Sequence, residues 1–279
     1  MNDLTDICQL AWFNNVNTYN YRDKHIVLYD DHRNILNVIF ESTKLNLFSE
    51  KVPNIIYFDH HDDACDTDVR LSKYGIDNIL EMNSRDFWSL IEFDLSVQDD
   101  DWVTAGMELG LINDVVCIGS EVNHNINSWD NNAYHTETNV EHKGFCINHL
   151  KWEIGNRGAL GDSMTEHHPE YNHIRNIFGY NNEHFTPSYH PYILDFDLDC
   201  FTTEYKETTY AWPERIFWEE YGAYYPKCSS FMQQLIARAS LITICREPKC
   251  CGGIGESNKI LGYLDRCLFD NALGTEPIQ

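Results

Sequence analysis

Two apolar runs in this chain end in acidic segments. The run 54–58 leads into the segment 59–63 (Asp-His-His-Asp-Asp), and the run 191–194 leads into the segment 195–199 (Asp-Phe-Asp-Leu-Asp). Alternate residues of an extended chain share a face, so we expect the first, third and fifth residues of each segment to point one way. Because like charges packed together are costly without a cation among them, the pattern predicts a site for divalent metal ions.

A third segment repeats this arrangement nearer the N-terminus. The apolar run 25–29 leads into Asp30-Asp31-His32, which again places residues able to bind metals after a short apolar run. We expect the three runs to be strands whose ends converge on one site.

Short apolar runs alternate with stretches of helical periodicity along the chain. Such interleaving predicts an α/β protein of three layers, with a mainly parallel sheet covered by helices on both faces. Ser84 is the expected cap of the second helix. The pattern predicts strands at 25–30, 54–58, 114–119, 191–198 and 240–246, and helices at 33–42, 84–93, 102–111, 229–239 and 256–269.

The chain length suits one large domain, and we expect residues 1–279 to form a single unit. The interval from about 121 to 189 breaks the strand–helix rhythm and is rich in Asn, His, Gly and Trp. Long segments of this kind within a domain are usually functional or partly disordered. We expect loop insertions there, built over the carboxyl ends of the strands.

The formal net charge of −24 limits the partners of this protein. Nucleic acids and anionic membranes select basic surfaces, so neither is expected to bind. The sequence shows no signal peptide and no apolar stretch of about 20 residues. We therefore expect a cytoplasmic protein without a membrane span, while the sequence leaves homo-oligomer formation open.

Ten cysteines in such a chain indicate reduced thiols. Cys245, Cys250 and Cys251 lie near one another in the sequence, but no CxxC pair occurs. A structural zinc site of the usual spacing is therefore not expected.

The acidic motifs, taken in order, resemble those of the arginase and deacetylase superfamily, and of the ureohydrolases in particular. The matching blocks are Asp-His at 31–32, Asp-x-His-x-Asp at 59–63 and Asp-x-Asp at 197–199. Further blocks at 57–62, 100–102, 194–201 and 241–246 are similar to a smaller, divergent branch. That branch includes peptide arginases, which convert arginine residues of ribosomally made precursor peptides to ornithine, releasing urea.

The resemblance implies two Mn²⁺ ions per chain. Asp59 and Asp197 would bridge the two ions, and Asp195 would lie in the second shell. Asp63 would pass a proton to the departing amine, with Asp59 as the other catalytic residue. The implied ligands are His32, Asp59, Asp63 and Asp197 for one ion, and Asp59, His61, Asp197 and Asp199 for the other.

Three departures from true arginases favour a peptide over free arginine. The upstream half-domain is missing, Cys200-Phe201 replaces the usual residues after Asp-x-Asp, and the loop glycines that hold a free amino acid are not evident. We expect an open, acidic site that admits an arginine-containing precursor peptide.

Substrate contacts are harder to assign. Glu247 and Glu256 follow the strand 240–246, where a carboxylate could hold a guanidinium, and Asp101 in the block 100–102 is a further candidate. Trp102 is expected to pack in the core or at its rim.

Other classes of function remain open from the sequence. The triplet at 59–61 is similar to the Asp-His-His phosphoesterases, but those enzymes place Asp-x-Asp before the triplet. A deacetylase-like amide hydrolase would use one metal ion, and a small-molecule ureohydrolase would act on free arginine. A metal- or peptide-binding module would keep the ligands without the chemistry.

Overall fold

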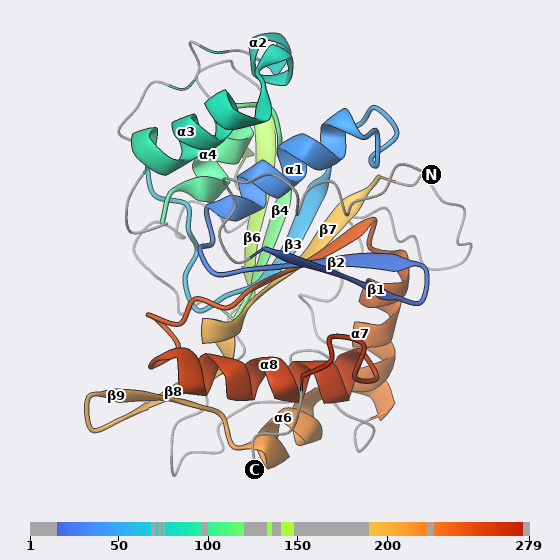
Figure 1. The fold of residues 1–279 in the computed structure, drawn as a ribbon, viewed down its shortest axis with the longest axis vertical. Coiled ribbons are helices and arrows are strands. Elements are labelled where there is room, and N and C mark those ends of the chain that lie inside the picture. The colour runs from blue at the N-terminus through green and yellow to red at the C-terminus, as the bar shows by residue number, and fades with distance from the viewer. Residues whose placement is uncertain are drawn as a thin grey trace.

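The fold is built on one eight-stranded sheet (Figure 1). The computed structural model describes residues 16–67, 71, 74, 76–95, 100–119, 133–135, 141–147, 190–221 and 226–275. The strands follow the order β1 (Asn17–Tyr21), β2 (Lys24–Tyr29), β10 (Leu241–Cys245), β7 (Tyr192–Asp197), β3 (Asn54–Phe58), β4 (Val115–Ile118), β6 (Glu141–Ile147) and β5 (Ala133–His135).

The strands from β2 to β6 in this order are parallel to their neighbours, whereas β1 and β5 are antiparallel edge strands. Among the described connections, β2 leads to β3 through one helix, and β3 leads to β4 through three helices. The described helices are α1 (Asn34–Lys44), α2 (Ile76–Glu81), α3 (Ser84–Asp94), α4 (Trp102–Glu108), α6 (Glu214–Tyr221), α7 (Pro226–Arg238) and α8 (Ile254–Leu268).

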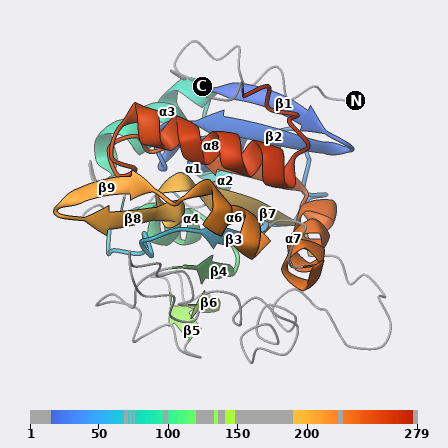
Figure 2. The same ribbon diagram turned by 90° about the horizontal axis from the view of Figure 1, so that it is seen from below.

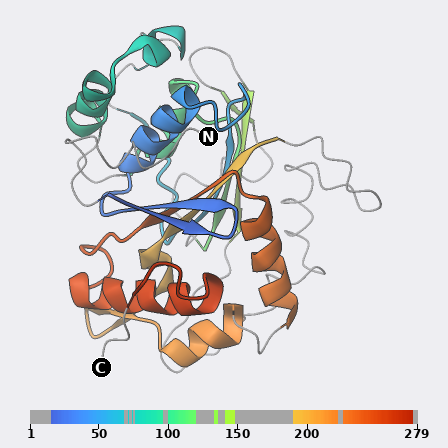
Figure 3. The same cartoon turned by 45° about the vertical axis from the view of Figure 1, so that its right-hand side comes forward.

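The sheet separates two apolar cores. In β2, Ile26 and Leu28 pack into the core shared with α7 and α8, whereas Val27 and Tyr29 pack into the core shared with α1 and α4. Figures 1 and 3 show the two groups of helices on opposite sides of the strands. Strands buried on both faces read as continuous apolar runs, and the predicted three-layer α/β class with a mainly parallel sheet is confirmed.

Each predicted strand and helix is present, with ends that differ from the prediction by at most three residues. The strand predicted at 54–58 is β3, Asn54–Phe58. The helix predicted at 84–93 is α3, but its cap is Asn83 rather than Ser84, because the Asn83 side chain accepts from the backbone N–H of Asp86. The helix predicted at 102–111 is shorter, since α4 ends at Glu108 and the chain turns at Gly110, where φ is 72°.

Two strands lie within the interval 121–189, where loop insertions were predicted. β6 lies beside β4 in the sheet and is parallel to it, and β5 is antiparallel to β6. Their sequences lack the apolar periodicity that marks the other strands, so these strands are defined by their pairing, β6 with β4 and β5 with β6, rather than by pattern. The rest of the interval lies outside the described residues.

A hairpin follows β7 through the 3₁₀ turn η4 (Leu198–Phe201). It consists of β8 (Thr202–Tyr205) and β9 (Thr208–Ala211), and it lies alongside the start of α8 (Figure 2). The backbone N–H of Ala211 donates to the Glu256 carboxylate at 2.9 Å, which joins the hairpin to this helix. Among the described residues, no helix is long and apolar enough to cross a membrane.

Gly106 allows α4 to pack closely on its neighbours. A Cβ at this position would meet Ile112 Cγ1 at 2.8 Å and Leu36 Cδ2 at 2.9 Å, and both of those side chains are fully buried. Gly106→Ala should therefore lower the free energy of unfolding by about 1–3 kcal/mol through overpacking, as measured by urea denaturation.

Gly262→Ala in α8 is the matched control for this change. The added Cβ would meet only Arg266 Nη1 at 3.2 Å and Thr275 Oγ1 at 3.9 Å, and the arginine side chain can move. This variant should be neutral, or more stable by up to about 1 kcal/mol, because Ala favours a helix over Gly. If both variants lost the same free energy of unfolding, overpacking at Gly106 would not explain the loss.

Candidate metal centre

Four adjacent strands bring the acidic segments together. In the order β2, β10, β7 and β3, each strand is parallel to the next, so their carboxyl ends lie at one edge of the sheet. His32 follows β2, Glu247 follows β10, Asp197 ends β7 and Asp59 follows β3. The predicted convergence of three strand ends is thus present, and β10 adds a fourth.

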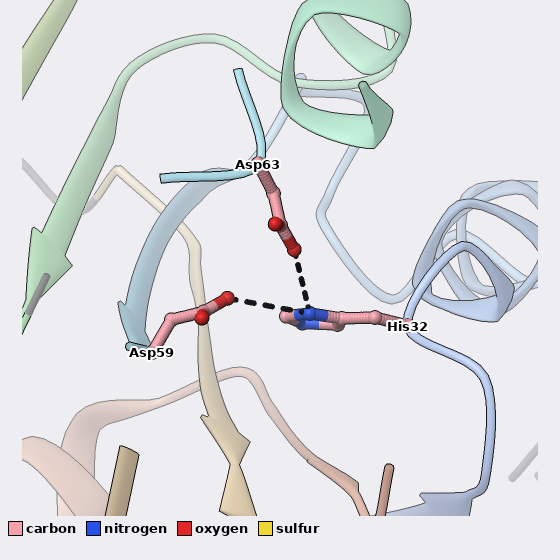
Figure 4. Close-up of side chains that lie close together, drawn as sticks. All are labelled: His32, Asp59 and Asp63. Carbon is pink, nitrogen blue, oxygen red and sulfur yellow. Dashed lines mark ion pairs between the residues drawn. The ribbon is translucent and has the colours of Figure 1, made fainter. Parts of the chain in front are cut away.

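The imidazole of His32 is the centre of the first cluster. Its Nδ1 atom lies 2.9 Å from Asp63 Oδ2, 3.0 Å from Asp197 Oδ2 and 3.3 Å from Asp59 Oδ2. Figure 4 shows the side chains of Asp59 and Asp63 directed at His32. Within the described part of the chain, neither Nδ1 nor Asp59 Oδ2 has a hydrogen-bond partner, although both are buried. One imidazole nitrogen facing several carboxylate oxygens is a donor set for a cation.

The other nitrogen of His32 fixes its orientation. Nε2 lies 2.8 Å from Asp195 Oδ2. The other Asp195 oxygen accepts from the Tyr29 hydroxyl at 3.1 Å and from the Thr243 hydroxyl at 2.5 Å. An Nε2–H that donates to Asp195 leaves the Nδ1 lone pair directed at the cluster, which is how carboxylates orient histidines that bind metals.

A second cluster lies on the solvent side of the first. His61 Nδ1 is 3.0 Å from Asp199 Oδ2 and 3.8 Å from Asp59 Oδ1. The His61 side chain is 45% exposed, whereas that of His32 is fully buried. Asp59 belongs to both clusters, and in each of them the possible ligand atoms lie within 4.8 Å of one another. A carboxylate in this position can bridge two cations.

Backbone N–H groups orient three of the carboxylates. Asp59 Oδ1 accepts from His61 N at 2.7 Å, Asp199 Oδ1 from His60 N at 3.1 Å, and Asp197 Oδ1 from Asp199 N at 3.1 Å. The second oxygen of each carboxylate faces one of the two histidines. The chain therefore holds one oxygen of each pair and presents the other to the centre.

Asp63 reaches the cluster by a route that the extended-chain prediction missed. The strand ends at Phe58, and Asp63 has φ of 47°, in the left-handed region. Trp102 Nε1 donates to Asp63 Oδ2 at 2.6 Å, and the indole lies against the His32 ring, with centroids 4.7 Å apart. Trp102 was expected only to pack, but it also positions Asp63.

Without a cation, the cluster retains protons. Burial and then the neighbouring Asp199 raise the pKa of Asp197 to about 8, and burial and then Asp197 raise the pKa of Glu247 to about 9. The Asp199 carboxylate beside His61 raises the pKa of the imidazole to about 9. Burial alone would raise the pKa of Asp199, but the neighbouring His61 lowers it below its ordinary value. Protons thus balance charge that a metal ion would otherwise balance.

The structure brings the predicted ligands into these two clusters, and their role as ligands stays a prediction. Of the predicted substrate contacts, Glu247 lies beside them, with a ligand atom within 4.8 Å of one on Asp199. Glu256 instead contacts Ala211 N and Lys259 Nζ, at 2.9 and 2.5 Å. Asp101 is buried at the start of α4. The residues brought together are His32, Asp59, His61, Asp63, Asp197 and Asp199.

Comparison with known proteins gives a likeness in fold alone. No protein-family model and no curated protein matches the sequence. Among solved structures, the chain is similar to proclavaminate amidino hydrolase from Streptomyces clavuligerus, with 10% identity and a TM-score of 0.44 over 90% of this chain. This chain spans 64% of the length of that enzyme. These values are too low to transfer a function, so function has to be inferred from the residues of the site.

Metal binding should release protons and strengthen with pH. Because Asp197, Glu247 and His61 keep protons up to about pH 8 or 9 in the metal-free protein, a cation must displace them. Calorimetric titration of Mn²⁺ in buffers of different ionisation enthalpy should show proton release near neutral pH. The affinity should rise toward about pH 9.

The stability of the metal-free protein should follow the opposite trend. The folded-state pKa values of Asp197, Glu247 and His61 exceed those of the unfolded chain, so the folded state binds more protons and loses stability as pH rises from about 5 to 9. With a chelator present, the melting temperature should fall as pH rises over this range. With saturating Mn²⁺, the melting temperature should depend less on pH. A pH-independent affinity without proton release would contradict the proposed cation site.

Asp195→Asn should weaken metal binding without removing a ligand. The neutral amide holds the His32 imidazole less firmly, and second-shell changes of this kind cost about 10–100-fold in metal affinity. The control is Asp265→Asn in α8, which also removes a buried carboxylate with several donors, namely Leu273 N, Thr275 N and Thr275 Oγ1. Both variants should lose thermal stability, but only Asp195→Asn should bind Mn²⁺ more weakly in equilibrium dialysis.

Proposed function

We propose that this chain is a manganese-dependent hydrolase that uses two metal ions to convert arginine residues of a ribosomally made precursor peptide to ornithine. In this reaction the guanidinium C–N bond to the side chain breaks and one water is consumed. The products are the ornithine amine and urea.

The observation that carries the proposal is the pair of clusters that share Asp59. The cluster His32, Asp59 and Asp63 and the cluster Asp59, His61 and Asp199 each offer imidazole and carboxylate donors. A shared carboxylate suits two cations at the short separation used in two-metal hydrolysis. A single-metal amide hydrolase has no need of a second cluster.

The donor set favours manganese over a thiophilic ion. Carboxylate oxygens suit Mg²⁺, Ca²⁺ and Mn²⁺, and imidazole adds a donor that the first two ions rarely use. Cations bound here would supply Lewis acidity and lower the pKa of the attacking water.

The residues of the chain have distinct roles in this reaction. Glu247 lies beside Asp199 at the half-exposed end of the site, where its carboxylate can bind and orient a guanidinium. Asp63 carries a proton to the departing amine, and the Trp102 indole holds its carboxylate in place. His32 is fully buried and would hold a cation at the base of the site.

The exposure and charge of the site support a peptide substrate. Solvent reaches the cluster at His61, whose side chain is 45% exposed, while the aspartates of the cluster are nearly covered. The chain carries a formal charge of −24, which attracts a cationic side chain and basic residues beside it.

Arginine within a peptide should be a better substrate than free arginine. Neighbouring residues contribute binding that a lone amino acid cannot, so kcat/KM for the peptide should be higher. The difference should narrow as salt rises and the screening length falls from about 10 Å at 0.1 M to about 3 Å at 1 M. The measurement is urea release, with mass spectrometry to locate ornithine in the peptide.

Two controls test whether the reaction is guanidinium hydrolysis, independently of which substrate is preferred. A peptide with lysine in place of arginine should release no urea, and Asp197→Ala should lose activity on peptide and free arginine alike, since its carboxylate faces His32. Equal or faster turnover of free arginine would leave a small-molecule ureohydrolase. One bound metal per chain would instead favour a deacetylase-like enzyme.

A further inference from the structure

A third set of donors adjoins the two clusters and includes a thiol. Ligand atoms of Asp199, Glu247 and Cys250 lie within 4.8 Å of one another. Asp199 is 2% exposed, and its Oδ2 atom is buried without a hydrogen-bond partner in the described part of the chain. The turn after β10 places the Cys250 thiol within 4.8 Å of the Glu247 carboxyl group. The set thus combines an unpartnered buried oxygen with a thiol and a second carboxylate.

We propose that Asp199, Glu247 and Cys250 form a third metal position, one that selects a thiophilic divalent cation such as Zn²⁺. The sulfur distinguishes it from the other two clusters, whose donors are oxygen and imidazole nitrogen only. Thiolate ligands favour Zn²⁺ over Mn²⁺. When the cation binds, the S–H bond of Cys250 breaks and the proton leaves to solvent. The resulting thiolate sulfur then coordinates the cation.

The loop after β10 makes Cys250, and not its neighbour, the ligand. Cys251 is fully buried, and its thiol donates to the carbonyl oxygen of Arg246 at 3.2 Å. Cys250 is partly exposed and accessible to an incoming ion. Glu247 has φ of 34° and accepts backbone bonds from both cysteines at 3.0 Å, so the turn fixes the separation of Glu247 and Cys250.

Sharing of Asp199 links this position to the second cluster. Asp199 also faces His61, with Oδ2 at 3.0 Å from Nδ1, so a cation on the thiol side would compete for a carboxylate that the Asp59–His61–Asp199 cluster needs, and would take Glu247 from the guanidinium of the proposed substrate. Zinc at this position would therefore oppose occupation of that cluster.

Cobalt provides a direct test, because Co²⁺ replaces Zn²⁺ and gives a sulfur-to-metal charge-transfer band when a thiolate binds it. Metal-free full-length protein is titrated with Co²⁺ to saturation, under argon, with a reductant that contains no thiol. The wild type and Cys251→Ser should show the band. Cys250→Ser should lose it while keeping the weaker visible bands of cobalt bound at imidazole and carboxylate. Glu247→Gln should shift the midpoint of the charge-transfer band to higher Co²⁺.

Circular dichroism confirms that each variant is folded, and Cys250→Ala serves as a second test if the serine variant is not. A missing band in the saturated wild type, or a band that survives loss of Cys250, would overturn the proposal. The measurement uses no substrate, so this outcome would leave the proposed hydrolysis standing. Conversely, a protein that released no urea could still bind a cation at the third metal position, so that result would not contradict this proposal.

Discussion

Repulsion between buried carboxylates is the constraint around which this protein is organised. Asp59, Asp63, Asp197 and Asp199 are each less than a tenth exposed and meet around two imidazoles at one sheet edge. Isolated charges in such surroundings cost several kcal/mol each, and in the metal-free protein raised pKa values of Asp59, Asp197 and Glu247 relieve part of that cost with protons. Such an arrangement is consistent with a metal site, in which a cation would replace those protons.

The rest of the fold supplies the rigidity that this repulsion demands. Two apolar cores on opposite faces fix the strands, and neither core depends on the charged residues at the edge. Each aspartate is then oriented locally, by a backbone N–H in the case of Asp59, Asp197 and Asp199, and by the Trp102 indole in the case of Asp63. The backbone donors bind one oxygen of Asp59, Asp197 and Asp199 and leave the other facing the centre. In Asp63 the indole donates to Oδ2, the same oxygen that faces His32. The site is thus preorganised for cations that balance its charge.

The sequence predicted the parts of the structure that depend on local pattern. Continuous apolar runs located β3 and β10 closely, because strands buried on both faces leave no other arrangement for such residues. β6 was missed because its position depends on pairing with β4 rather than on its own pattern. In the site, the alternation rule placed Asp195 and Asp197 on one face of β7, but it failed for Asp63, whose left-handed conformation ends the extended segment. The role of Trp102 requires a contact across 39 positions, which no local pattern encodes.

The two clusters are unequal, and the asymmetry follows from the depth of their histidines. His32 is fully covered, and Asp195 holds it through its other nitrogen, so a cation in the first cluster would be bound by an oriented, buried ligand. His61 is nearly half exposed and lies where Asp199 also faces Glu247 and Cys250. A cation on that side would be bound by a more exposed ligand and would compete for a shared carboxylate. In the proposed enzyme, the deeper position would therefore neutralise the core of the cluster, and exchange with solvent, substrate and other metal ions would take place at the outer one.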